Sequence, residues 1–88
     1  MDIEATIIQL LGRRAPEASI CPSDVARALA ADEAAWRALM PQVREVAAAL
    51  ARSGRVVITQ GAERLSPEDV DRGPVRLRRG PGWSKAQK

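Results

Sequence analysis

The residues of this sequence that could do chemistry are arginines, and many of them lie toward the C-terminus. Residues 72–88 contain six basic residues and no acidic one, whereas residues 1–51 contain five arginines against seven acids. A guanidinium is planar and permanently charged, and its fork of N–H donors matches the oxygens of phosphate and carboxylate groups. We therefore expect the basic end to bind a polyanion or an anionic surface. The alternative is that an arginine-rich end only improves solubility.

Residues 75–78 alternate apolar and basic side chains, which is typical of a half-exposed strand. Successive side chains of a strand point to opposite faces, so Arg76 and Arg78 should share the face that turns away from the core. Further basic residues lie close by in the sequence, namely Arg64, Arg72 and Arg79. Such a row of guanidinium groups suits phosphates. Contacts to phosphates position a protein on nucleic acid but carry no information about the base sequence. The charges could instead protect an edge strand from aggregation.

A second group of candidate residues lies on the predicted third helix. Its members are polar side chains that can hydrogen-bond to base edges, namely Arg37, Gln42, Arg44 and Arg52. Between them the same helix face carries Glu45, Ala48 and Ala49, which form a poor surface for reading bases. The alternative is an ordinary solvated helix face.

The residue types that are missing exclude several classes of function. The sequence has no His, Tyr or Phe, which removes the commonest general base, most zinc sites and the usual platforms for stacking bases. Cys21 is the single cysteine, and we expect it to be a small core residue rather than a reactive thiol. The acids Glu68, Asp69 and Asp71 fit a capped helical turn better than a cation site. We therefore expect no enzyme, no cofactor and no metal.

The apolar periodicity predicts helices at residues 2–13 and 22–31, with an extended link at 19–21 between them. Because Pro41 cannot donate to the preceding helical turn, we expect a short turn at 32–37 and a main third helix at 40–53. Trp36 and Leu50 should lie on the core side of this region. The β-branched residues 55–59 and the alternating residues 75–78 predict two strands.

Three helices followed by two strands predict an α+β, mainly helical fold of the winged helix-turn-helix type, with a two-stranded β-hairpin as its wing. Because a two-stranded hairpin is not stable alone, it must pack against the helices through four apolar side chains, namely Val56, Ile58, Val75 and Leu77. We expect one domain at residues 1–80 and a flexible basic tail at 81–88. An acidic N-terminus and the lack of a long apolar run predict no signal peptide and no membrane partner, and hence a cytoplasmic protein.

Four segments resemble an uncharacterised family of short bacterial proteins with a winged-helix-like domain of unknown function. They are ICPSDVARAL at 20–29, WRALMPQVR at 36–44, GRVVITQG at 54–61 and RGPVRL at 72–77. The resemblance covers roughly residues 3–79 and implies a fold, but it carries no activity with it.

Two functions remain open at this point. The first is binding of double-stranded DNA through the basic hairpin and the third helix, as in a small transcriptional regulator. The second is a module for protein–protein interaction or homodimerisation, for which the alanine-rich face of the third helix would allow close helix packing.

Overall fold

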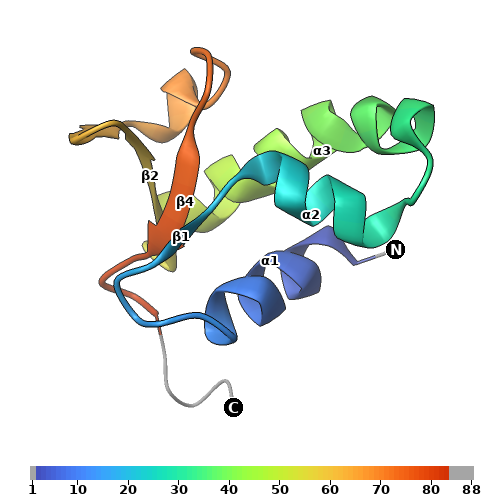
Figure 1. Ribbon diagram of the computed structural model, residues 1–88. Helices are drawn as coiled ribbons and strands as arrows, with labels where there is room; N and C mark the ends of the chain where they lie inside the picture. Colours follow the sequence, from blue (N-terminus) through green and yellow to red (C-terminus); the bar gives the residue numbers. More distant parts are fainter. Residues whose placement is uncertain (1, 84–88) are drawn as a thin grey trace.

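Three helices and a four-stranded antiparallel sheet make up the computed structural model, which describes residues 2–83. In chain order the elements are α1 (Ile3–Gly12), β1 (Ser19–Ile20), α2 (Pro22–Leu29), α3 (Glu33–Arg52), β2 (Val56–Gln60), β3 (Glu63–Leu65), the 3₁₀ turn η1 (Pro67–Asp69) and β4 (Arg76–Arg79) (Figure 1). The strand order in the sheet is β1-β4-β2-β3, so β1 and β3 form its two edges. The predicted α+β class is confirmed.

The sheet has four strands where the sequence predicted a two-stranded hairpin, and this part of the prediction is wrong. The two predicted strands are β2 and β4, each one residue later than expected, and they pair from Thr59↔Arg76 to Val56↔Arg79. The expected extended link forms β1 on the other side of β4, and Glu63–Leu65 returns from a turn at Gly61 as β3. Strands of two and three residues have too little pattern to be recognised without their partners.

The first two helices begin at side chains that satisfy their free backbone N–H groups. The Asp2 carboxylate accepts from the N–H of Ala5 at 3.0 Å, and α1 then runs over almost all of the predicted range. Pro22 is the first residue of α2, and the N–H of Cys21 before it donates to the Asp24 carboxylate at 2.9 Å. Cys21, which we expected in the core, is half-buried at this helix end.

Helix α3 is one continuous helix of 20 residues, so the predicted break into a turn and a later helix is wrong. It begins earlier because the Asp32 carboxylate accepts from the N–H of Ala35 at 3.1 Å. Pro41 lies inside the helix on its exposed side, where the carbonyl of Arg37 that lacks its usual donor can face water. Within residues 2–83, no helix combines the length and apolarity that crossing a membrane requires.

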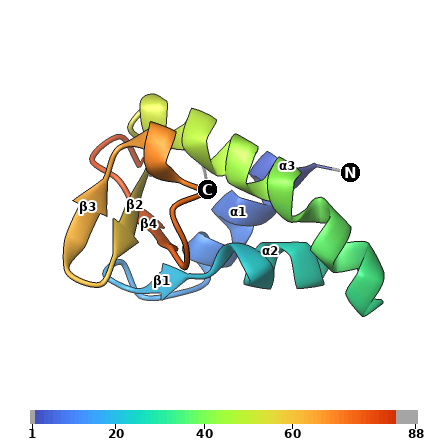
Figure 2. The ribbon, with the colours of Figure 1, turned by 90° about the horizontal axis from the view of Figure 1, so that it is seen from above.

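The sheet lies at one end of the molecule (Figure 2). The core lies between the helices and one face of this sheet. Burial alternates along β2, so Val56 and Ile58 face the helices while Val57 and Thr59 lie on the outer face. The four apolar residues predicted to anchor the hairpin are all buried: Val56, Ile58, Val75 and Leu77. Leu50 is buried as expected.

Trp36, which we predicted to be a core residue, is only half-buried beside the core. Its ring lies 4.7 Å from the guanidinium carbon of Arg27 on α2 and 5.1 Å from that of Arg37 on α3. Both distances fit attraction between a cation and the electron-rich face of an indole. The Trp36 side chain therefore connects α2 to α3 through cation–π contacts at the surface, in addition to packing against the core.

The chain continues to pack beyond residue 80, where we expected the domain to end. The N–H of Gly82 donates to the carbonyl of Gly54 at 2.7 Å. The half-buried Trp83 ring lies 4.9 Å from the guanidinium carbon of Arg79 and close to Gly12 at the end of α1. The remainder of the tail that we predicted to be flexible, residues 84–88, lies outside the described residues.

Candidate nucleic-acid interface

Strand pairing brings three arginines together on the outer face of the sheet. Thr59 on β2 has Arg64 on β3 as its partner on one side and Arg76 on β4 as its partner on the other. Arg78, two residues along β4, lies on the same face opposite Val57. Cross-strand partners have neighbouring side chains, so the three guanidinium groups share one surface. Arg76 and Arg78 thus lie on one face, turned away from the buried Leu77, as the alternation predicted.

Two of these arginines are held by hydrogen bonds to Glu17 and Ser19, at the end of the α1–β1 connection and the start of β1. Arg76 donates from Nε to the Ser19 hydroxyl at 2.9 Å and from a terminal nitrogen to the Ser19 carbonyl at 3.2 Å. Arg78 donates to the carbonyl of Glu17 at 2.7 Å. A carbonyl acceptor leaves the positive charge uncancelled, and a guanidinium has five N–H groups, so donors remain for a further anion. These contacts fix the position of both charges.

Arg79 points to the other side of β4 and has a largely structural environment. It donates to the carbonyls of Leu11 and Arg14 at 3.2 and 3.0 Å, where a cation complements the negative end of the α1 dipole. Its Nε is buried and has no hydrogen-bond partner among residues 2–83. The Trp83 ring stacks on this guanidinium and covers it further. Of the predicted β4 residues, Arg79 is therefore the least available to a ligand.

The term basic surface is used below for the outer face of the sheet together with the adjoining end of α1. The sheet face contributes Arg64, Arg76 and Arg78. The end of α1 contributes Arg13, Arg14 and the guanidinium of Arg79. No member forms an ion pair with a carboxylate among residues 2–83; the ion pairs there involve other arginines. Arg13 and Arg14 follow α1 and are exposed. The sequence analysis did not single them out, because nothing local shows that β4 returns beside them.

The candidate residues of α3 do not come together as a reading surface. Arg44 turns toward the loop before β4 and donates to the carbonyl of Val70 at 2.7 Å, with only 22% of its side chain exposed. Arg37 is paired with Glu33 at 2.7 Å. Gln42 and Arg52 are exposed, and no hydrogen bond joins their side chains to another described residue.

Helix α3 is also partly covered by the segment that follows β3. The 3₁₀ turn η1 packs against α3, as the view from above shows (Figure 2). Ala48, which we placed on the exposed side of the helix, is buried at 5% exposure. Only part of the predicted reading face of α3 therefore remains open to a partner.

The loop between η1 and β4 is held by a side chain that the sequence analysis did not single out. Gln60, the last residue of β2, donates from its amide nitrogen to the carbonyls of Arg72 and Pro74 at 2.8 and 3.1 Å. Arg72, a predicted phosphate ligand, is exposed on this loop and lies 3.6 Å from the Asp69 carboxylate. Its charge is thus locally compensated, unlike those of the basic surface.

The two sides of the protein differ in charge. The segments that build the basic surface, residues 13–20, 56–65 and 76–79, contain six arginines and two carboxylates. The term α3 surface is used below for α3 with its cap and for η1 with the following loop, residues 32–53 and 66–74. These segments contain six carboxylates and four arginines. An anion should be attracted to the first surface and repelled by the second.

Comparison with known proteins gives a family without an assigned activity. No curated protein matches the chain. A match to the family described as "Protein of unknown function (DUF3253)" covers residues 1–80 and so includes every element from α1 to β4. This agrees with the resemblance of the four sequence segments to an uncharacterised family. The chain belongs to the DUF3253 family.

Proposed function

We propose that the protein is a winged helix-turn-helix protein that binds double-stranded DNA through the basic surface. The order α1-β1-α2-α3 followed by β2 and β4 supports a winged helix, with α2 and α3 as the helix-turn-helix pair. The wing would then be the segment between β2 and β4, which contains β3 and η1. The proposal is of a cytoplasmic binding protein rather than an enzyme.

The observation that carries the proposal is that three arginines of the α3 surface are paired with carboxylates, whereas those of the basic surface are paired with none within residues 2–83. Arg37, Arg44 and Arg72 on the α3 surface each lie within 4.0 Å of a carboxylate. On the basic surface, Arg76 and Arg78 of β4 are held by neutral carbonyl and hydroxyl groups. Charges that are positioned but not cancelled are suited to phosphate oxygens, which the same guanidinium groups can bind through their remaining N–H groups.

This arrangement favours binding that tolerates many DNA sequences. Phosphate contacts fix the position of a protein on the duplex but carry no sequence information. In the usual helix-turn-helix complex the second helix of the pair enters the major groove. Here that helix, α3, presents Glu45 and alanines on its exposed side, so we expect it to contribute little base readout.

The test uses fluorescence anisotropy with two unrelated DNA duplexes over a range of salt concentrations. If four or five arginines of the basic surface contact phosphates, the slope of log affinity against log salt should be roughly −3.5 to −4.5. The double variant Arg13→Gln/Arg64→Gln should flatten this slope by about two and weaken both duplexes equally. These two arginines are chosen because their side chains make no hydrogen bond within residues 2–83 that the substitution would break.

The matched control is the double variant Arg37→Gln/Arg52→Gln, which removes the same charge from α3. It should leave the slope nearly unchanged. A parent protein without affinity for either duplex at low salt, or a control that flattens the slope as much as the basic-surface variant, would refute the proposal.

The second candidate function is protein–protein interaction, and the exposed side of α3 is the observation that favours it. Ala38 and Ala49 there allow close approach of another helix, and Glu45 makes the side unsuited to phosphate. Sedimentation velocity at several protein concentrations tests the simplest case, a homodimer. Self-association without affinity for DNA would favour this function over the first.

A further inference from the structure

Two hydroxyl groups on the outer face of the sheet lie beside arginines and keep their hydrogens free. The Ser19 oxygen on β1 accepts from Nε of Arg76 at 2.9 Å, and the Thr59 oxygen on β2 accepts from Nε of Arg78 at 3.4 Å. A hydroxyl that accepts can still donate its own hydrogen. Neither hydroxyl donates to another residue of the described range, 2–83, and both side chains are half-buried. Both hydrogens can therefore bind an anion next to the arginines.

Strand pairing gathers these four residues on one part of the sheet. Strand β4 lies between β1 and β2 (Figure 1), with Ser19 as the partner of Arg78 on one side and Thr59 as the partner of Arg76 on the other. Arg76 and Arg78 are two residues apart, which is about 7 Å along a strand. Cross-strand partners have neighbouring side chains, so the two guanidinium and two hydroxyl groups share one patch. We call these four residues the β4 site.

The β4 site has more donors than its internal hydrogen bonds use. Arg76 donates to the hydroxyl and the carbonyl of Ser19, and Arg78 donates to the Thr59 hydroxyl and the Glu17 carbonyl. A guanidinium has five N–H groups, so about three remain on each arginine. Within residues 2–83, no carboxylate oxygen lies within 4.0 Å of either guanidinium, because the ion pairs there involve other arginines. The site thus combines two uncancelled charges with free N–H and O–H donors.

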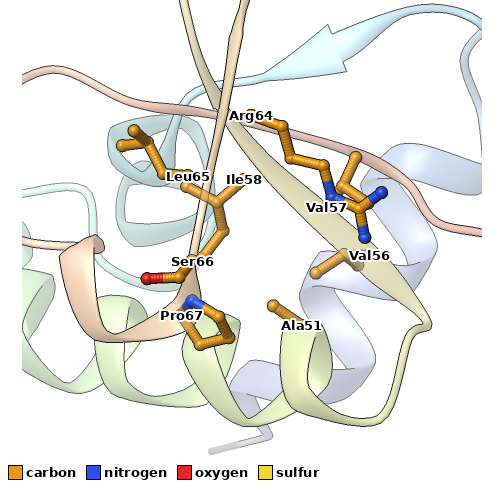
Figure 3. Close-up of a pocket in the computed structure, with 8 residues that line it drawn as sticks. All are labelled: Ala51, Val56, Val57, Ile58, Arg64, Leu65, Ser66 and Pro67. Atoms are coloured by element: carbon orange, nitrogen blue, oxygen red, sulfur yellow. The ribbon is translucent and has the colours of Figure 1, made fainter.

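A third cation is directed toward this site from the opposite side of β2. The side chain of Arg64 extends from β3 across β2 toward Val57, which is the strand partner of Arg78 (Figure 3). Arg64 is exposed, and its side chain forms neither a hydrogen bond nor an ion pair with any residue from 2 to 83. Its charge adds to the local positive potential, which attracts an anion in proportion to the charge that the anion carries. The surroundings therefore favour a dianion over a monoanion.

We propose that the β4 site binds the phosphate of a phosphomonoester, held by Arg76 and Arg78 together with the hydroxyl groups of Ser19 and Thr59. A phosphomonoester carries close to two negative charges at neutral pH and has three strong acceptor oxygens. Two guanidinium groups balance this charge, and charge-assisted hydrogen bonds to the oxygens are the strong ones. A phosphate within the DNA backbone carries a single charge and matches the site less well. The β4 site lies within the basic surface, but the proposal does not depend on binding of duplex DNA.

The test is an NMR titration of the full chain, labelled with ¹⁵N, with methyl phosphate at about pH 7.5, where this monoester is a dianion. Backbone signals of Ser19, Thr59 and Arg78 should shift together and saturate. Dimethyl phosphate has the same tetrahedral centre with a single charge, and it should bind at least about tenfold more weakly. Equal affinity for the two phosphates, or shifts that do not saturate, would overturn the proposal.

Variants of the two hydroxyl residues separate the β4 site from a general effect of charge. Thr59→Val keeps the shape of the side chain and removes its hydroxyl, so it should weaken binding of methyl phosphate about tenfold. Thr59→Ser keeps the hydroxyl and should retain most of the affinity, whereas Ser19→Ala should lose about as much as Thr59→Val. The control Arg52→Gln removes an exposed arginine from α3 and should leave the affinity unchanged. Unaffected Thr59→Val and Ser19→Ala variants, or an equal loss in Arg52→Gln, would contradict the assignment.

A competition experiment distinguishes two sources of the phosphomonoester, the 5′ end of a DNA strand and a free phosphorylated molecule. If the strand end is the source, a duplex with 5′-phosphates should displace methyl phosphate at a lower concentration than the same duplex with 5′-hydroxyl ends. Equal displacement by the two duplexes assigns the site to a free phosphorylated molecule. Because methyl phosphate is titrated without DNA, a failure of the proposed DNA binding would leave the outcome of that titration unchanged.

Discussion

Arginines of identical chemistry have different roles in this protein, and their position in the fold decides which. Arg44 and Arg52 lie eight residues apart on one helix, and both were candidates for reading bases. Arg44 instead reaches a carbonyl 26 residues away, at Val70, whereas Arg52 is exposed at the end of α3. Helix periodicity predicts which side chains face water, but the partner of Arg44 comes from a loop whose path the sequence pattern does not reveal.

Arg44→Ala should lower the free energy of unfolding by about 1–3 kcal/mol. The substitution leaves the carbonyl of Val70 without its charged donor and loosens the loop from α3. Arg52→Ala removes the same side chain from an exposed position and should change stability by less than about 0.5 kcal/mol. Urea denaturation followed by circular dichroism measures both. Equal effects of the two substitutions would contradict the role that we assign to Arg44.

At the scale of elements, the predictions from sequence succeeded where a pattern extends over several turns or residues. Helix α1 and strands β2 and β4 were found within one residue of their observed ends, because apolar periodicity, a β-branched run and apolar–basic alternation mark them locally. The strands β1 and β3 were missed because each exists only through pairing with a neighbour. Of the candidate site, the shared face of Arg76 and Arg78 was predictable, whereas the approach of α1 to β4 was not.

The continuity of α3 through Pro41 leads to a prediction about that helix. Pro41→Ala should stabilise the protein by about 1–2 kcal/mol. Alanine restores the N–H that can donate to the carbonyl of Arg37, and this gain exceeds the added freedom of the unfolded chain. The exposed neighbour substitution Gln42→Ala should have an effect below about 0.5 kcal/mol. A lower melting temperature for Pro41→Ala would show that the proline favours the helix as it stands.

Gly80, which follows β4, and Gly12, at the end of α1, should respond oppositely to the same substitution. A Cβ at Gly80 would overlap the carbonyl oxygen of Gly54 and lie 2.9 Å from backbone atoms of Val56. Gly80→Ala should therefore destabilise the protein by about 1–3 kcal/mol. At Gly12, the last residue of α1, a Cβ would lie 4.0 Å from the Trp83 ring, which is ordinary contact. Gly12→Ala should thus be neutral or stabilising by up to about 1 kcal/mol in thermal unfolding.

At the scale of the whole molecule, charge is separated in space more clearly than along the chain. The sequence shows a basic C-terminal part, but half of the basic surface comes from residues before position 72, at the end of α1 and on β3. The contact that joins these parts, from Arg79 to the carbonyl of Arg14, spans 65 residues. The sequence also places Asp69 and Asp71 next to Arg72, but only the fold brings Asp71 to Arg44 and makes the α3 surface acidic.

This separation predicts which side of the protein faces DNA, and the exposed Glu45 on α3 tests it. If the basic surface makes the contact, Glu45 stays away from the duplex, and Glu45→Gln should change the affinity by less than about twofold at 0.15 M salt. Exposed charges farther apart than about 8 Å are largely screened at that ionic strength. If α3 instead lies in the major groove, removing a carboxylate from its middle should raise the affinity several-fold. Anisotropy titrations of the parent, Glu45→Gln and Arg64→Gln with one duplex distinguish the two orientations, because only the variant on the bound side should shift the binding curve.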